Sequence, residues 1–282
     1  MEETDPRTEV GRLGASLNVM LGRIEEAMDE RRASEEALRR FLADASHELR
    51  TPLTSIRGYA ELFRRGASDD PADTALAMRR IEQEGERMGV LVEDLLFLAR
   101  AGQGRPIAHE PVDVVRVAAD AVNDARAVDP TREIELEAPD LLEVSGDDGR
   151  LRQVFANLLS NALTHTSSGT PVTVRLRADD GWAEIEVSDR GPGLAADEAA
   201  HVFEPFYRAD PARGRARADD WDDEQGTGLG LAIVAAIAEA HGGDVGVTSE
   251  PGDGATFRVR LPVAGLTPDD DPSPSASTRD GS

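Results

Sequence analysis

The chain has 282 residues and no cysteine, and its formal net charge is −24, with arginine supplying every one of the 31 basic side chains. The lack of thiols excludes disulfides and thiolate metal sites, and the acidic balance disfavours nucleic acid or an anionic membrane surface as the main partner, because their phosphates would be repelled. No apolar run approaches the ~20 residues that span a bilayer, and the charged start does not resemble a signal peptide, so the sequence predicts a soluble chain.

Two long helical runs occupy the first third of the sequence. Apolar residues recur at intervals of three and four over residues 10–63 and again over 76–98, on either side of the turn signal GASDDP. One hairpin of two such helices cannot enclose its own apolar stripe, so we expect a homodimer that forms a four-helix bundle. Within the first run, Pro52 is predicted to bend the helix rather than to start one, because its ring crowds the carbonyl of Glu48.

The helical pattern breaks around residues 102–106, and the sequence then changes to a mixture of helices and strands. Strands are predicted at about 133–137, 142–145, 172–178, 182–189, 244–250 and 255–262, and helices at about 113–127, 148–165 and 229–241. Strands mixed with helices, without regular βαβ alternation, indicate an α+β sandwich with helices on one sheet face. The end of the chain is rich in Pro, Ser and Asp and is predicted to be disordered.

The segment ASHELRTP lies in the first helical run and contains His47. A neutral imidazole offers a ring nitrogen that can attack phosphorus. Glu48 is placed to accept the ring proton or to orient the ring, and the hydroxyl of Thr51 lies one helical turn from His47 on the same face. Taken alone, a single helical histidine is more often a solvated or packed residue.

The segment QVFANLLSNALTHT places Asn157, Asn161 and His165 four residues apart, so that they share one face of a helix. Two amide oxygens one turn apart suit a hydrated Mg²⁺ that is also bound to phosphates. On composition alone, polar asparagines on a solvated face are the commoner explanation.

Two glycine-rich segments follow, SDRGPGL at the end of a strand and GTGLGLAIV before a helix. Asp189 in the first can accept a hydrogen bond from an adenine amino group, and the free N–H groups at the start of the helix would face phosphate. The glycines, which allow close backbone approach, are Gly191 and Gly193 in the first segment and Gly226, Gly228 and Gly230 in the second. The second segment is not a Walker A loop, which needs a lysine.

In chain order, ASHELRTPL, NLLSNAL, DRGPGL, FEPFYR and GTGLGLAIV resemble the H, N, G1, F and G2 boxes of sensor histidine kinases. The resemblance covers roughly residues 9–264. It implies an all-α helical hairpin that forms a dimeric four-helix bundle, followed by an α+β Bergerat-type ATP-binding sandwich. The implied parts are a partial HAMP-like signalling helix (1–34), a dimerisation and histidine phosphotransfer hairpin (35–102), a linker (103–110), an ATP-binding catalytic domain (111–264) and a disordered tail (265–282).

The resemblance also implies that the protein phosphorylates itself from ATP with Mg²⁺, passes the phosphoryl group to an aspartate of a response regulator, and acts as the phosphatase of that partner. His47 is then the phosphoacceptor, with Glu48 and Thr51 beside it. The implied nucleotide residues are Asn157 as the Mg²⁺ ligand, Asn161 and Arg208 near the phosphates, His165 and Asp189 at adenine, Gly191 and Gly193 in the adenine pocket, and Gly226, Gly228 and Gly230 beside the phosphates.

The HAMP-like start implies that the first half of that module and the transmembrane helices lie outside this chain. The full-length protein is therefore expected at the cytoplasmic side of the cell membrane. Its attachment to the membrane is expected only through an N-terminal part that this chain does not include.

The sequence departs from the family pattern in the N box, in the HAMP-like stretch and in the expected ATP lid. Thr164 stands where the family usually has a basic residue, His165 stands where it often has an aromatic one, and residues 8–11 replace an acidic pair. The segment between Arg208 and Gly226, the expected ATP lid, is long and carries three arginines followed by five acidic residues. We hypothesise that these charges pair when ATP is absent, and a solvated loop without a regulatory role is the alternative.

Two other functions remain compatible with the sequence. One is a degenerate kinase that acts as a signalling scaffold or a phosphatase. The other is a hydrolysing ATPase of the same fold, which is disfavoured because Gln153 stands where those enzymes have the glutamate that activates water, and an amide cannot act as that base.

Overall fold

The computed structural model describes residues 9–64, 71–101, 110–208 and 227–265. The chain divides into two compact units, Met1–Met88 and Gly89–Ser282. The expected ATP lid with Gly226, the HAMP-like residues 1–8, most of the predicted linker and nearly all of the predicted tail lie outside the described residues.

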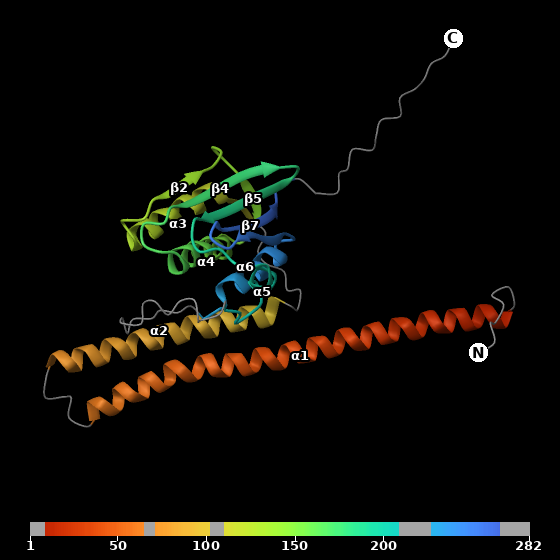
Figure 1. Cartoon of the computed structure of the whole chain (residues 1–282), viewed down its shortest axis with the longest axis horizontal. Helices are drawn as coiled ribbons and strands as arrows, with labels where there is room; N and C mark the ends of the chain where they lie inside the picture. Colours follow the sequence, from red (N-terminus) through yellow and green to blue (C-terminus); the bar gives the residue numbers. More distant parts are fainter. Residues whose placement is uncertain (1–8, 65–70, 102–109, 209–226, 266–282) are drawn as a thin grey trace, which may run out of the picture. The chain divides into compact units, whose positions relative to one another are not determined.

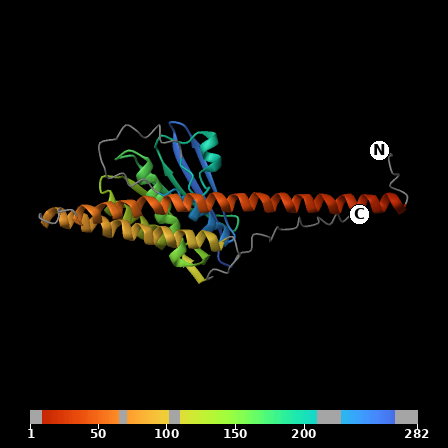
Figure 2. The same ribbon diagram turned by 90° about the horizontal axis from the view of Figure 1, so that it is seen from below.

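The first unit is helical, as the sequence predicts. It contains α1 (Glu9–Arg64) and most of α2 (Pro71–Ala101), and two perpendicular views show these helices side by side (Figures 1 and 2). The helix α1 continues through Pro52, whose side chain is buried, so this proline does not begin a new helix. The bend predicted there stays a prediction.

Much of the apolar stripe of α1 is open to solvent in a single copy of the chain. Five apolar side chains in the N-terminal half of α1 are each about half exposed: Leu17 48%, Met20 53%, Leu21 47%, Ile24 47% and Met28 50%. Such a continuous apolar surface on one helix is typical of a helix that packs against a partner.

The second unit is built on a five-stranded sheet in the order β2-β4-β5-β7-β6. The strands are β2 (Ile134–Glu137), β4 (Val172–Asp179), β5 (Trp182–Asp189), β6 (Asp244–Glu250) and β7 (Gly254–Pro262). The pair β2–β4 is parallel and the other pairs are antiparallel. A separate antiparallel ribbon joins β1 (Glu110–Asp113) to β3 (Glu143–Gly146).

The helices α3 (Val114–Val128), α4 (Asp148–His165) and α6 (Gly230–Ala240) cover one face of this sheet (Figure 1). Along β4 the buried side chains alternate with more exposed ones, and the buried set points toward the helices. The opposite face is charged and carries cross-strand ion pairs such as Arg177–Glu186 and Arg260–Asp244. The predicted α+β sandwich with helices on one face is therefore confirmed.

Two short elements were not predicted from the sequence. These are β1, which has four residues and contains Pro111, and α5 (Ala196–His201), which has six residues. Neither is long enough to show a hydrophobic period.

A buried arginine ties the end of α4 to the strand region. The side chain of Arg132 is 3% exposed and forms an ion pair of 3.1 Å with Asp129. Its other nitrogens donate to the hydroxyl of Thr166 and to the carbonyl oxygens of Thr170 and Leu163, the last two at 3.2 Å. All three nitrogens of the guanidinium therefore donate to acceptors, one in the turn after α3 and the others at the end of α4 and in the segment that follows it.

Replacing Arg132 by methionine is expected to lower the free energy of unfolding by about 3 kcal/mol, because several buried acceptors lose their donor at once. Urea unfolding at neutral pH measures this loss. The matched control is Arg177→Met, whose side chain is 54% exposed and paired with Glu186. That control is expected to cost less than about 1 kcal/mol, and equal losses in the two variants would contradict a bracing role for Arg132.

Candidate functional site

The helix α4 presents the predicted polar face. Asn157 and Asn161 are half-buried and His165 is exposed, whereas Val154, Leu158 and Ala162 are buried. The side-chain amide nitrogen of Asn157 donates to the carbonyl oxygen of Gly230 at 3.1 Å. This bond occupies the amide nitrogen of Asn157, so the amide oxygen is the atom of this side chain that can serve as a metal ligand.

The segments FEPFYR and GTGLGL are joined through their backbones. The N–H of Phe206 donates to the carbonyl of Gly228 at 2.9 Å, and both residues have positive φ, +63° and +71°. A Cβ on Gly228 would lie 3.0 Å from the backbone of Phe206. Gly228 is therefore needed both for its left-handed conformation and for this close approach. Gly226 lies outside the described residues.

The chain that leaves β5 is held tightly around Asp189. The N–H of Gly191 donates to the Oδ1 of Asp189 at 2.8 Å, and a Cβ on Gly191 would lie 2.6 Å from the methyl carbon of Thr166. Gly193 has φ +67°, and a Cβ there would lie 2.0 Å from the carbonyl oxygen of Glu250. Both glycines thus allow a close backbone approach in the segment after Asp189, and their role in an adenine pocket stays a prediction.

Asp189 and His165 lie close enough to influence each other's pKa, and the charge of Arg208 also acts on the pKa of His165. Burial raises the pKa of Asp189, although hydrogen bonds from the backbone of Gly191 and Ala255 and the nearby His165 act in the opposite direction. The surrounding protein partly desolvates the ring of His165 although the residue is exposed, and this is the main cause that lowers its pKa. The positive charge of Arg208 lowers the pKa further, and Asp189 opposes the shift. His165 is therefore kept neutral at neutral pH, which suits stacking on a base.

Two contributors to this site were missed by the sequence reasoning. Thr166 is buried at 9% exposure, donates to the carbonyl of Ala162 and accepts from Arg132, so it fixes the wall against which Gly191 packs. The hydroxyl of Ser249 accepts from the N–H of Leu194 at 2.8 Å and holds the segment after Gly193 against β6. The bonds of Thr166 with Arg132 and of Ser249 with Leu194 join residues far apart in the sequence, so no local pattern indicates them.

The predicted phosphoacceptor belongs to the other unit. On α1, His47 is exposed, Glu48 is half-buried and Thr51 is exposed. The hydroxyl of Thr51 donates to the backbone carbonyl of His47 at 3.4 Å, one helical turn back. The three residues therefore lie together on one accessible stretch of helix, as the sequence predicts.

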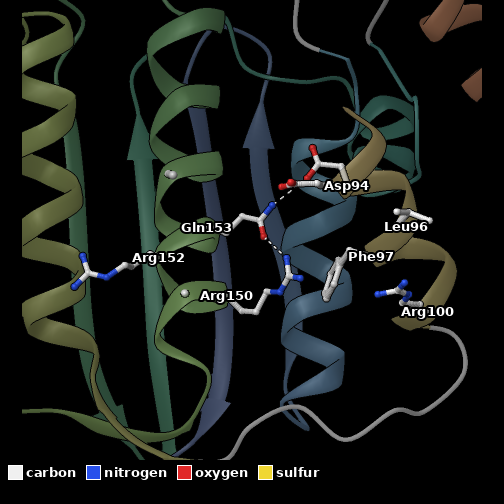
Figure 3. A pocket seen from close by; sticks show the side chains of 10 residues that line it. Asp94, Leu96, Phe97, Arg100, Arg150, Arg152 and Gln153 are labelled. Atoms are coloured by element: carbon white, nitrogen blue, oxygen red, sulfur yellow. Dashed lines mark hydrogen bonds between the residues drawn. The ribbon is translucent and has the colours of Figure 1, made fainter. Parts of the chain in front are cut away.

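A cleft of about 530 Å³ lies between the last turns of α2 and the first half of α4 (Figure 3). Within it the amide of Gln153 donates to Asp94 at 3.0 Å and accepts from Arg150 at 2.8 Å. The guanidinium of Arg150 also lies 4.1 Å from the centre of the Phe97 ring. Burial raises the pKa of Asp94, and the hydrogen bond from Gln153 opposes this. The residues that line this cleft do not include the predicted nucleotide ligands.

Two family models match the chain. Residues 37–104 match the His Kinase A (phospho-acceptor) domain, and residues 146–265 match the family described as histidine kinase-, DNA gyrase B- and HSP90-like ATPase. The chain belongs to the sensor histidine kinase family. His47 falls within the first of these regions, and Asn157, Asp189 and Gly230 fall within the second.

Curated relatives agree with this assignment. A protein of Mycobacterium tuberculosis described as a probable sensor histidine kinase, TcrY, is 48% identical over 94% of this chain and 54% of its own length. The sensor histidine kinase TrcS of the same organism is 42% identical over 93% of this chain and 51% of its own length. The chain thus spans about half the length of the curated relatives that it matches.

Solved kinase structures share the fold. The Acinetobacter baumannii histidine kinase AdeS matches with a TM-score of 0.58 at 25% identity, over 77% of this chain and 98% of its own. Full-length ShkA in complex with AMPPNP matches with a TM-score of 0.57 at 31% identity, over 80% of this chain and 46% of its own. None of the helices that the structure describes in this chain is long and apolar enough to cross a bilayer.

Proposed function

We propose that this kinase moves the γ-phosphoryl group of ATP to His47 and then to an aspartate of a response regulator. The single observation that carries the proposal is the joining of three sequence segments at one site. Asn157 of α4 bonds Gly230 at the start of α6, and Gly228 just before it bonds Phe206 of FEPFYR.

In this proposal the nucleotide lies across the second unit. The Oδ2 of Asp189 accepts from the adenine amino group, while its Oδ1 is already held by Gly191. The neutral imidazole of His165 stacks on the base, and the first N–H groups of α6 face the phosphates. Asn161 and Arg208 add polar and positive groups beside them.

The residues present fit a Mg²⁺ ion. Asn157 offers an amide oxygen whose direction is fixed by the hydrogen bond to Gly230, and Mg²⁺ in kinases is held by few protein ligands together with phosphate oxygens. When bound, the ion neutralises negative charge on the phosphates.

In this proposal the nucleophile that attacks the γ-phosphate is His47. A bond forms between a ring nitrogen and the γ-phosphorus, the bond from that phosphorus to the β-phosphate oxygen breaks, and ADP leaves. The half-buried carboxylate of Glu48 takes the ring proton or holds the ring in its reactive tautomer. The phosphoryl group then passes to a response regulator, which needs the exposed position that His47 occupies on α1.

Incubation of the full chain with ATP labelled on its γ-phosphate, with Mg²⁺, tests this function. Acid-labile label on the protein supports a histidine kinase. Free labelled phosphate without labelled protein would instead indicate the hydrolysing ATPase, and the absence of both would indicate the degenerate scaffold. The bonds of Gln153 to Asp94 and Arg150 speak against hydrolysis, since its amide has no base character and is engaged on both sides.

We also propose that the active form is a homodimer. The half-exposed apolar side chains along α1 give a second copy of the chain a surface to cover. Sedimentation velocity at micromolar concentration is expected to give twice the chain mass of 30.2 kDa.

Replacing Thr51 by alanine is expected to leave autophosphorylation intact and to slow dephosphorylation of the response regulator on the order of tenfold, because the hydroxyl one turn from His47 would no longer position the attacking water. The lifetime of the phosphorylated regulator, with and without the kinase variant, measures this.

The matched control is Thr54→Ala on the same helix. The hydroxyl of Thr54 makes the same kind of bond, to the carbonyl of Arg50 at 2.8 Å, but lies two turns from His47. This control is expected to behave as the wild type. A regulator lifetime that is the same with Thr51→Ala as with the wild type would reduce Thr51 to an ordinary helix residue beside Pro52.

A further inference from the structure

The imidazole of His241, just after α6, has no part in the function described above, yet it is 5% exposed and bonded through both nitrogens. Its Nδ1 lies 2.7 Å from the carbonyl oxygen of Ile237, and its Nε2 lies 3.1 Å from the backbone nitrogen of Asp147. A carbonyl can only accept and an N–H can only donate, so Nδ1 carries the hydrogen and Nε2 accepts. The ring is therefore held as one neutral tautomer.

The backbone around the ring is shaped to admit it. The helix α6 ends in a turn in which Gly242 has φ +74° and the N–H of Gly243 donates to Ala238 at 2.8 Å. On the other side, a Cβ on Gly146 would lie 2.6 Å from two atoms of the His241 ring. Any side chain at Gly146 would displace the imidazole of His241 from its hydrogen bond with the N–H of Asp147.

This N–H belongs to the residue that begins α4. Asp147 is the N-cap of that helix, and its carboxylate accepts from the N–H of Arg150 at 3.0 Å. His241 therefore holds the start of α4 against the end of α6. Further along α4, Asn157 bonds Gly230 at the start of α6. Two hydrogen bonds, one at each end of α6, thus fasten the two helices in an antiparallel arrangement.

The surfaces between these two bonds are apolar. The buried side chains of the helices include Leu151, Val154, Phe155 and Leu158 on α4 and Ile233, Val234 and Ile237 on α6. Apolar contact is non-directional, so it fixes the position of one helix along the other less strictly than a buried polar pair does. A displacement of a fraction of the ~5.4 Å helical pitch would already move Asn157 relative to the start of α6.

We propose that His241 is a positioning residue of the nucleotide site: it sets the register of α4 against α6, and so the placement of Asn157 relative to the phosphate-facing start of α6. The proposal rests on the proposed function, because ATP with Mg²⁺ is the ligand that uses both helices at once. His241 itself touches neither nucleotide nor metal in this arrangement.

Two polar variants with side chains of different length distinguish the effect of the hydrogen bond to Asp147 from the effect of losing the volume of the ring. The amide oxygen of His241→Gln can reach the N–H of Asp147, whereas the shorter side chain of His241→Asn cannot. Calorimetry on the full chain is expected to give His241→Asn about a tenfold weaker affinity for ATP with Mg²⁺, the effect of one lost hydrogen bond, and His241→Gln an affinity within about threefold of the wild type.

The control for general loss of stability is Leu176→Ala. Leu176 is 2% exposed on β4, and its truncation leaves a cavity without removing a bond between α4 and α6. It is expected to lower the melting temperature and to leave ATP affinity within about twofold of the wild type. A loss of affinity that follows the melting temperature in all three variants, or equal affinities of His241→Gln and His241→Asn, would overturn the proposal.

A second readout needs no nucleotide. In the ligand-free chain, amide exchange of Asp147 is expected to be faster in His241→Asn, and the side-chain amide signals of Asn157 to shift, with neither change in His241→Gln or Leu176→Ala. If the wild type bound no ATP, the proposed function would fail, but these signals would still decide the role of His241. Unchanged Asn157 and Asp147 signals in His241→Asn would show that the ring does not set the register.

Discussion

Replacing His47 by glutamine is expected to abolish phosphoprotein formation while leaving the affinity for ATP unchanged. Glutamine keeps a polar side chain of similar reach on α1 but has no nitrogen lone pair that can attack phosphorus. His47 is exposed on its helix and is not required for packing, so the variant is expected to fold like the wild type. Labelling from γ-labelled ATP and calorimetric titration with ATP measure the two quantities separately.

The matched control for His47 is His201→Gln in the second unit. His201 is likewise exposed, and its ring is bonded at 2.7 Å to Glu204. This control is expected to label at the normal rate, because the residue lies outside the proposed chemistry. Label that persists in His47→Gln, or that disappears only in His201→Gln, would refute the assignment of His47 as phosphoacceptor.

The helix that carries the asparagines shows how far sequence reasoning reaches. The predicted range 148–165 is the observed range of α4, and the polar face of that helix is the one on which Asn157 and Asn161 stand. The start of the helix and the position of its polar face both follow from local causes. Asp147 is an N-cap residue, and apolar residues at helical spacing form the face that packs against the sheet. The lengths of β4 and β5 were predictable for the same reason, since alternation is a local signal.

The order of the strands was not predictable in this way. In the sheet, β7 lies between β5 and β6, and β2 pairs in parallel with β4. Strands such as β4 and β5 share the same alternating pattern, which says which face is buried but not which neighbour a strand pairs with. The choice of neighbour depends on contacts between residues that are distant in sequence.

The supporting residues of the site were hidden for the same reason. Arg132 meets Thr166 across 34 residues, and His241 meets Asp147 across 94 residues. A sequence pattern could place Asp189 at the end of a strand before glycines, but the burial that raises the pKa of its carboxyl comes from the folded surroundings. Motifs thus identify the groups that we propose as ligand contacts, whereas the residues that orient those groups appear only in the fold.

Replacing Asp189 by asparagine is expected to weaken ATP binding roughly ten- to a hundredfold, which corresponds to about 1.5–3 kcal/mol for a hydrogen bond to a charged group. The N–H of Gly191 already donates to Oδ1 of Asp189 at 2.8 Å. In the variant this N–H keeps the amide oxygen, and the amide nitrogen is left facing the adenine amino group. Two donors then face each other in a half-buried site, and the adenine amino group loses its acceptor.

The pH dependence of ATP affinity provides an independent check. Burial raises the pKa of Asp189 above that of an ordinary aspartate. The carboxylate is the form that accepts from adenine, so on acidification the wild type is expected to lose affinity earlier than a solvated aspartate would allow. The asparagine variant has no such titration, and its affinity is expected to lack that step.

The control is Asp180→Asn, which makes the same change of charge but leaves the proposed contact between Asp189 and adenine intact. Asp180 is exposed in the turn between β4 and β5 and has φ +43°, a conformation that asparagine accepts readily. Both variants lose one negative charge, so any effect of net charge on the binding of anionic ATP is shared. Calorimetry is expected to show weakened binding only for Asp189→Asn. Equal affinities in the two variants, with the same pH profile as the wild type, would mean that adenine is held by other groups.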